Sequence, residues 1–224
     1  MKSKRILIYF SLLIILGSIN NISLNQLVIF DKIKNIKING LSDSENYDLL
    51  KNIEKLNLKN IFFLNENEIN KVIQSNTLVE NFKIFKSYPS TLYIEIEKTN
   101  FLAKISDNGK IFLIGSNGKL TQLEHGYSEL PYIFGKPSIK EFLKLKRIID
   151  LSQFSYNQIK NIYFFPSKRW DLNLKDNVLL KLPNNITVDT IDYLYKFLEN
   201  YGVENYTIVD ARLNNKIIVN EKRK

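Results

Sequence analysis

The single histidine of this chain, His125, is the first residue to test for catalysis, because imidazole is the commonest general base in enzymes. It stands in Leu123-Glu124-His125-Gly126, between segments rich in turn residues, which is typical of an exposed loop. No serine lies in a Gly-x-Ser-x-Gly elbow, and no glycine-rich loop precedes Lys-Ser or Lys-Thr. We expect no enzyme; an exported hydrolase that uses His125 is the catalytic alternative.

The acidic residues do not suggest a metal site either. Asp and Glu are scattered, and Glu95 and Glu97, on one face of a predicted strand, fit a solvated face. The chain has no cysteine, which excludes disulfides, thiolate chemistry and cysteine-ligated metals. We therefore expect no cofactor, no metal and no small-molecule substrate.

The positive charge of the chain does not predict a nucleic-acid partner. The formal net charge is +9, but Lys and Arg are spread along the sequence and mixed with Asp and Glu. The longest basic group beyond the N-terminus is the tail, residues 222–224. A solvated surface explains this pattern better than a basic groove.

Two parts of the chain could bind a partner protein. Trp170, the only tryptophan, is either a core residue or, with Arg169 before it, an interface anchor, since Trp and Arg are enriched in hot spots. Residues 216–220 are predicted to form a strand that is an edge of its sheet. Such an edge can accept a partner's strand, unless Lys216 and the charged tail blunt it.

These residues must be positioned by folded elements, and the first element is an apolar N-terminal segment. Basic residues within 1–5 precede an apolar run over 6–16. A helix over 6–24 would approach the roughly 20 residues that span a bilayer, and its basic flank predicts a cytoplasmic N-terminus with the bulk outside. Because no small-x-small pattern follows Leu16, an uncleaved signal-anchor is favoured over a cleaved signal peptide.

After a linker over residues 25–32, residues 33–100 predict a small β-α-α-β-β domain. The stretch 33–38 alternates as a short strand. Capping patterns at Ser42 and Asn65 each precede apolar residues at helical spacing. Two further strands follow, and the second, Thr91–Lys98, alternates cleanly between apolar and polar residues.

Residues 101–220 predict a second domain, a β-sheet with flanking helices, followed by a charged tail over 221–224. Short apolar pieces are separated by turn sequences such as Asp107-Asn108-Gly109. Helical spacing appears over 142–151 and 187–198, and Leu130–Gly135 is expected to be non-helical. The expected strands cover residues 159–165, 170–174, 178–182, 207–213 and 216–220. The fold class is thus α+β, with a transmembrane helix and two domains.

The whole arrangement resembles the FtsQ/DivIB family of bacterial division proteins. The residues that carry the resemblance are Ile36-Lys37-Ile38-Asn39-Gly40-Leu41, Tyr88-Pro89-Ser90-Thr91-Leu92-Tyr93-Ile94-Glu95-Ile96, Ile114 with Gly118 and Leu120, Leu130-Pro131 with Gly135, Arg169-Trp170-Asp171-Leu172-Asn173-Leu174, and Val209-Asp210-Ala211-Arg212-Leu213. The second of these, similar to the family's P-x-T-L-x-I-x-I passage, is the most specific. The chain departs from the pattern at Lys98, Phe101, Gly115 and Leu213.

The resemblance implies a non-enzymatic scaffold of the divisome, a single-pass inner-membrane protein with a periplasmic POTRA-like domain. It implies that an FtsB/FtsL-type partner binds at the C-terminal edge strand, where Leu213 replaces a frequent aromatic. The expected partner-binding residues are Arg169, Trp170, Arg212, Leu213, Lys216, Ile217, Ile218, Val219 and Asn220. Another POTRA-bearing secretion or assembly component is the alternative, although the chain has no second POTRA repeat and too little length for a barrel.

Overall fold

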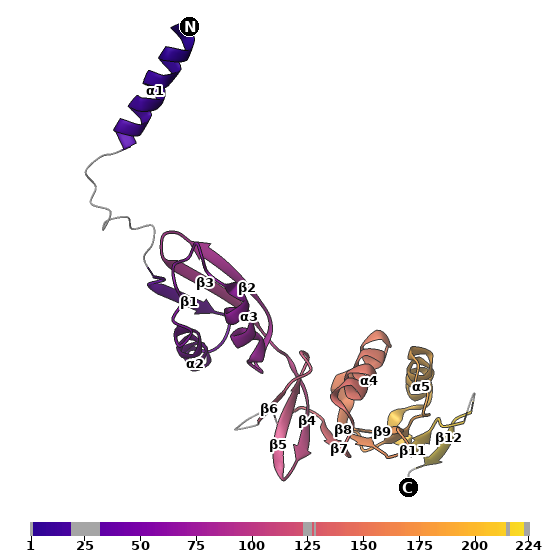
Figure 1. Cartoon of the computed structure of the whole chain (residues 1–224). Coiled ribbons are helices and arrows are strands. Elements are labelled where there is room, and N and C mark those ends of the chain that lie inside the picture. The colour runs from indigo at the N-terminus through magenta and orange to yellow at the C-terminus, as the bar shows by residue number, and fades with distance from the viewer. Residues whose placement is uncertain (1, 19–31, 123–126, 128, 214–215, 222–224) are drawn as a thin grey trace. The chain divides into compact units, whose positions relative to one another are not determined.

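The computed structural model describes residues 2–18, 32–122, 127, 129–213 and 216–221. Contacts divide the chain into two compact units. The first comprises Met1–Ile73 and Phe82–Ile96, and the second comprises Gln74–Asn81 and Glu97–Lys224 (Figure 1). We describe each unit by itself.

The N-terminal helix, α1 (Lys2–Ser18), begins before the expected start at Ile6. Its side chains from Ile6 to Ile15 are all exposed. The part of the expected helix over residues 19–24 lies outside the described residues. Across the residues that the structure describes, no helix has both the length and the apolar character that crossing a membrane requires.

The first unit has the predicted β-α-α-β-β order. Its elements are β1 (Asn35–Asn39), α2 (Asp43–Glu54), α3 (Glu66–Ser75), β2 (Val79–Ser87) and β3 (Thr91–Lys98). The sheet order is β1-β3-β2, and β1 runs parallel to β3 with Ile36 opposite Leu92 and Ile38 opposite Ile94. The strand alternation predicted for β3 is confirmed, because Leu92, Ile94 and Ile96 are buried.

Both helices of the first unit start at the predicted caps. The Ser42 backbone N–H donates to Glu45 Oε2 at 2.9 Å, which is half of a capping box. The Asn65 side chain accepts the N–H of Asn67 at 3.1 Å and so opens α3. Each helix then buries two apolar residues against the sheet: Leu49, Ile53, Ile69 and Ile73.

The second unit contains one nine-stranded sheet. Its strands are β4 (Phe101–Asp107), β5 (Lys110–Gly115), β6 (Leu120–Gln122), β7 (Tyr132–Phe134), β8 (Ile159–Phe164), β9 (Trp170–Leu174), β10 (Leu179–Lys181), β11 (Tyr206–Asp210) and β12 (Ile218–Glu221). Their order is β12-β11-β10-β9-β8-β7-β4-β5-β6. The passage expected only to be non-helical therefore supplies a strand, β7.

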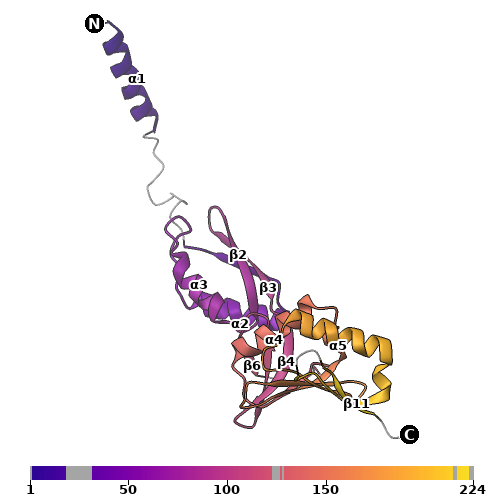
Figure 2. The ribbon, with the colours of Figure 1, turned by 90° about the vertical axis from the view of Figure 1, so that its right-hand side faces the viewer.

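Two helices cover one face of this sheet, as Figures 1 and 2 show. α4 (Ile139–Leu151) connects the parallel strands β7 and β8, and α5 (Val188–Tyr201) connects the parallel strands β10 and β11. A parallel pair needs such a crossover. The helices bury their apolar faces, including Phe142, Ile149, Ile191 and Leu194, against one shared core. Two short 3₁₀ helices, η3 (Tyr156–Gln158) and η4 (Val203–Asn205), complete the unit.

The segment Gln74–Asn81 belongs to the second unit through side-chain hydrogen bonds. Asn117 Nδ2 donates to the carbonyl oxygens of Thr77 and Val79, both at 2.9 Å. The carboxylate of Glu80 accepts from the hydroxyls of Thr99 at 2.8 Å and Ser116 at 2.6 Å. These contacts satisfy backbone carbonyls beside the start of β2.

Candidate partner-binding edge

Strand β12 forms one edge of the nine-stranded sheet. It pairs antiparallel with β11 on one side, with Val219 opposite Val209 and Ile218 opposite Asp210. All its residues are exposed, including the apolar Ile218 (55%) and Val219 (37%). Among the described strands none pairs with its other side, so the outward N–H and C=O groups can accept an added strand.

The edge strand is held in place despite its exposure. A register irregularity between Tyr206 and Ile208 leaves Thr207 as an extra residue, and its hydroxyl donates to the carbonyl oxygen of Asn220 at 3.1 Å. Ile217, just before the strand, is half-buried and packs against the core. The backbone of β12 is therefore held in place along the side that pairs with β11.

The last two strands are shorter than the sequence predicts. The strand expected over 207–213 ends at Asp210, and the one expected over 216–220 begins at Ile218. Asp210 Oδ1 accepts the backbone N–H of Arg212 at 3.0 Å, and this local bond turns the chain out of the sheet. Leu213 and Lys216 thus lie in the connection, outside both strands.

The connection lines a hollow of about 270 Å³ beside the start of α5. Leu213 and Lys216 lie on one side of it, and Tyr193 on α5 and Thr187 at its N-cap contribute further. Both Leu213 and Tyr193 are exposed. Asn185, Asp189 and Thr190 line it as well, so the hollow is largely polar and could accommodate a polar or amphipathic side chain of a bound partner next to β12.

Arg212 forms a tight ion pair with Asp210. Its Nε lies 2.8 and 2.9 Å from the two carboxylate oxygens, and its second terminal nitrogen donates to Oδ2 at 2.5 Å. These hydrogen bonds from Arg212 hold the pKa of the Asp210 carboxyl below its ordinary value, and the carboxylate raises the pKa of Arg212 in turn.

Arg169 makes a similar contact with Asp171, which is only 2% exposed. Its Nε donates to Asp171 Oδ1 at 3.1 Å, and its guanidinium lies 4.2 Å from the ring centroid of Phe165. Burial raises the pKa of the Asp171 carboxyl, and the hydrogen bond from Arg169 offsets part of this rise.

The two pairs belong to one row of charges across β9, β10 and β11. Lys181 on β10 is the register partner of Asp171 on β9 and of Asp210 on β11. Arg169 and Arg212, which the sequence selected separately, therefore flank one alternating row with Lys181 at its centre. The neighbours Leu172, Leu180 and Val209 are buried in the core, so the row lies on the face of the sheet away from α4 and α5.

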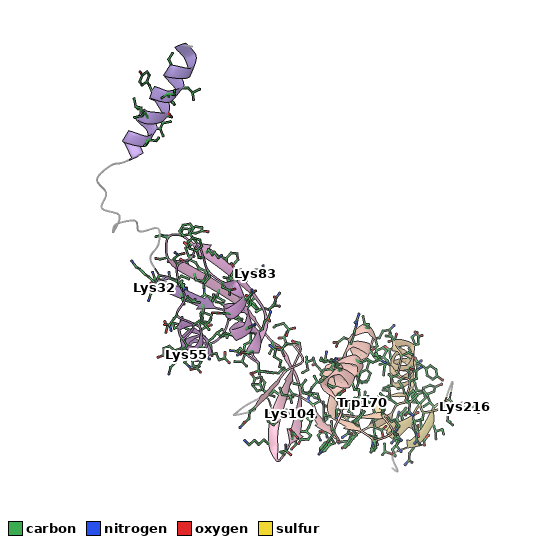
Figure 3. All side chains as sticks on the ribbon, viewed as in Figure 1. Lys32, Lys55, Lys83, Lys104, Trp170 and Lys216 are labelled. Carbon is green, nitrogen blue, oxygen red and sulfur yellow. The ribbon has the colours of Figure 1, made fainter. Side chains whose placement is uncertain are left out.

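Trp170 does not lie at the surface. It is only 5% exposed, belongs to the core cluster and packs against the ring of Phe164 at 4.6 Å between centroids. Of the two interpretations of this residue, burial favours the core residue. Figure 3 marks its position on the ribbon; its strand, β9, is separated from the edge strand β12 by β10 and β11.

Sequence reasoning selected the ends of this charge row and missed its centre. Lys181 carries no motif, and only the pairing of β10 with both neighbours brings it between two aspartates. Over the described part of the chain, no group of three or more His, Cys, Asp or Glu residues could hold a metal ion. The candidate base His125 lies outside the described residues.

The architecture defines a protein with a POTRA domain followed by a β-sheet domain. Residues 31–98 match the model described as POTRA domain, FtsQ-type, and residues 96–212 match the model described as Cell division protein FtsQ/DivIB, C-terminal. The chain belongs to the FtsQ/DivIB family of cell division proteins. The second match ends at Arg212, so β12 lies beyond it.

The chain is also similar to proteins named cell division protein FtsQ. The cell division protein FtsQ of Rickettsia typhi is 23% identical over 193 residues, which are 84% of this chain and 72% of that protein. The FtsQ of Rickettsia prowazekii is 25% identical over 194 residues, with the same coverage. The solved extracytoplasmic domain of DivIB from Geobacillus stearothermophilus aligns with 46% of this chain and 88% of its own, at 14% identity and a TM-score of 0.32.

Proposed function

We propose that this protein is a non-enzymatic scaffold of the bacterial divisome that binds an FtsB/FtsL-type partner by strand addition to β12. In this proposal residues 33–100 form the POTRA-like domain and residues 101–220 the β domain. Family membership supports the division role, and the exposed edge supports the mode of binding. The match of the FtsQ/DivIB C-terminal model disfavours a secretion or outer-membrane assembly component.

The proposal rests on one observation about β12: the strand is paired with β11 along one side, and no described strand pairs with its other side. Strand addition gains affinity from main-chain hydrogen bonds, and specificity from side chains that alternate along the strand. Ile218 and Val219 supply exposed apolar side chains for the two faces of an extended sheet. The opposite edge strand, β6, exposes less: Leu120 and Thr121 are half-buried.

Two neighbouring features extend the proposed contact beyond β12. The largely polar hollow beside Leu213 and Lys216 would accept a polar or amphipathic residue of the partner that follows or precedes the added strand. Arg212, two residues after the end of β11, is exposed. We retain Arg212, Leu213, Lys216, Ile217, Ile218, Val219 and Asn220 as proposed contact residues. Arg169 is proposed to act through Asp171 in the charge row, and Trp170 to support the sheet from the core.

We further propose that the N-terminal segment anchors the protein in the inner membrane. Residues 1–5 would be cytoplasmic, residues 6–24 would span the bilayer, residues 25–32 would be a linker, and the two domains would be periplasmic at the septum. The basic flank and the apolar, outward-facing side chains of α1 support this topology.

Two nested truncations of the full chain test the edge-strand proposal. Deleting residues 218–224 removes β12, whereas deleting only residues 222–224 removes the basic tail and keeps the strand. Loss of β12 is expected to weaken binding of FtsB/FtsL-type partners by at least about 30-fold, as the loss of one interface hot spot does. Binding would be measured by biolayer interferometry in detergent.

The shorter truncation is the control and should retain affinity within about threefold, since exposed charges contribute little. Hydrogen exchange over β8 and β9 monitors whether each variant is folded. If the variant without β12 is folded and binds like the intact chain, strand addition at this edge is wrong.

A further inference from the structure

Three aromatic side chains point into solvent from two neighbouring loops of the first unit. Phe62 is 49% exposed, Phe63 is 73% exposed and Tyr88 is 59% exposed. The rings of Phe62 and Tyr88 lie 4.7 Å apart between centroids, so the loop after α2 and the turn between β2 and β3 form one patch. We call Phe62, Phe63 and Tyr88 the aromatic patch. Such a cluster is unusual on a solvated surface.

The loop holds these rings outward. Asn60 Oδ1 accepts the backbone N–H groups of both Phe62 and Phe63 at 3.1 Å. Ile61, which lies between Asn60 and Phe62 in the sequence, is fully buried in the core. The two phenylalanines therefore cannot turn into the core without displacing Ile61 and breaking both hydrogen bonds.

The patch lies where the chain enters the first unit from the N-terminal segment. Lys32 forms an antiparallel bridge with Asn60, the residue that positions the phenylalanines. The Ile33 N–H donates to the Lys59 carbonyl at 3.3 Å, and the Lys34 N–H donates to the Ser90 carbonyl at 2.9 Å, in the turn that carries Tyr88. Figure 3 labels Lys32 at this end of the unit.

Exposed lysines surround the aromatic patch. Both Lys32, which forms the bridge with Asn60, and Lys59, which directly precedes Asn60, are exposed. Glu66, the first residue of α3, is paired with Lys86 at 2.7 Å. Aromatic rings beside exposed lysines are typical of segments that rest in a lipid headgroup layer.

We propose that the aromatic patch with Lys32 and Lys59 docks on the surface of an anionic lipid bilayer. The rings enter the headgroup region, and the lysine ammonium groups contact lipid phosphates. This inference rests on the proposed membrane anchoring of α1, whose side chains from Ile6 to Ile15 are exposed and apolar except Ser11.

The length of the tether selects a bilayer as the occupant. In the proposed topology only seven residues, 25–31, separate the spanning segment from Lys32. Fully extended, seven residues reach at most about 25 Å. A patch at the end of so short a tether meets the bilayer at a high effective concentration, so even weak contacts are occupied.

The absence of cysteine from the chain makes a direct test practical, because one introduced cysteine is a unique labelling site. The full chain is reconstituted in vesicles of phosphatidylglycerol and phosphatidylethanolamine, with a nitroxide on Phe63→Cys. The control label is on Tyr47→Cys, an exposed aromatic of α2 outside the patch. Accessibility of each nitroxide to oxygen and to a water-soluble nickel complex is measured by electron paramagnetic resonance.

The label at position 63 is expected to be accessible to oxygen and protected from the nickel complex, whereas the label at position 47 is accessible to nickel. Lys59→Gln should lower the docked-to-undocked ratio about fivefold, the contribution of one lysine near an anionic surface. Lys55→Gln, a surface lysine at the end of α2, should leave it unchanged. Vesicles of phosphatidylcholine alone should also lower the docked fraction.

A label at Leu12→Cys, on α1, separates failure of docking from failure of anchoring. If position 12 is immersed while position 63 matches position 47, the anchor stands and the docking inference is wrong. If position 12 is also aqueous, the anchoring part of the proposed function fails. Protection of position 63 only after division proteins are added would identify a protein surface and overturn the lipid assignment.

Discussion

Arg212 encloses the carboxylate of Asp210, the residue two positions before it, with hydrogen bonds from two of its side-chain nitrogens and from its own backbone N–H. The pair stands where the chain leaves β11 for the connection to β12. A local contact between two residues therefore sets the path into the edge strand.

The Asp210 pair should make stability depend on pH in the acidic range. The pKa of Asp210 is lowered in the folded protein, so its stabilising contribution is complete above the unfolded value of about 3.9 and is lost as the pH falls through the folded value. Asp210→Asn is expected to cost about 1 kcal/mol at pH 7 and much less at pH 3. Urea unfolding at both pH values measures this difference; an equal cost at the two would contradict it.

Asp171→Asn should behave in the opposite way. The pKa of Asp171 is raised by burial, so the folded state holds its proton more tightly than the unfolded chain does. The corresponding stability is present below the unfolded pKa and lost as the pH rises through the folded pKa. Asp171→Asn, which can still accept a bond from Arg169, is expected to equal or exceed the wild-type free energy of unfolding at pH 7.

The control for this variant is Asp107→Asn, at the exposed end of β4. It should leave the free energy of unfolding within about 0.5 kcal/mol, as surface substitutions usually do. A clear loss of stability in Asp171→Asn at pH 7 would mean that Arg169 and Lys181 outweigh the cost of burying the carboxylate.

Two substitutions of Trp170 distinguish a role in the core from a direct contact with the partner. Trp170→Ala should lower the free energy of unfolding by about 3–5 kcal/mol, because it empties a buried site beside Phe164. Trp170→Phe keeps most of the packing and should leave partner affinity within about twofold. A stable Trp170→Phe variant with much weaker partner binding would show that the indole contacts the partner.

Comparing alanine substitutions of Gly135 and Gly109 isolates the effect of close contact between Gly135 and the backbone of Phe164. Both have positive φ, +100° and +78°, but a Cβ at Gly135 would lie 2.3 Å from the carbonyl oxygen of Phe164, whereas one at Gly109 would have open space. Gly109→Ala should cost about 1–2 kcal/mol from the backbone alone. Gly135→Ala should cost clearly more, as thermal or urea unfolding of the two variants can measure; equal costs would contradict the proposed clash.

Local patterns of the sequence predicted most of the fold. The caps at Ser42 and Asn65, the alternation of Thr91–Lys98 and the turn at Asn108-Gly109 are each decided by neighbouring residues, and the structure has helices and strands where they predict them. β7 was missed because three residues of strand beside Pro131 carry no readable period. Such a short strand forms only because β4 and β8 pair with its two sides.

The candidate site was less predictable. The apolar residues at 217–219 indicated a terminal strand. β11, however, ends at Asp210, whose side chain accepts the N–H of Arg212, and periodicity does not contain such a side-chain contact. The pairing of Lys181 with two aspartates depends on the order β9-β10-β11, which no local pattern specifies. Burial of Trp170 likewise required the position of α4 over the sheet.

The place of β12 at the edge of the sheet has a consequence for the strand that it covers. Without β12, β11 would itself be the uncovered edge, and its residues Tyr206, Ile208 and Val209 would stand beside the open side. β12 therefore serves two surfaces at once. It closes the largely apolar strand behind it and, under the proposed mode of binding, presents Ile218 and Val219 to a partner.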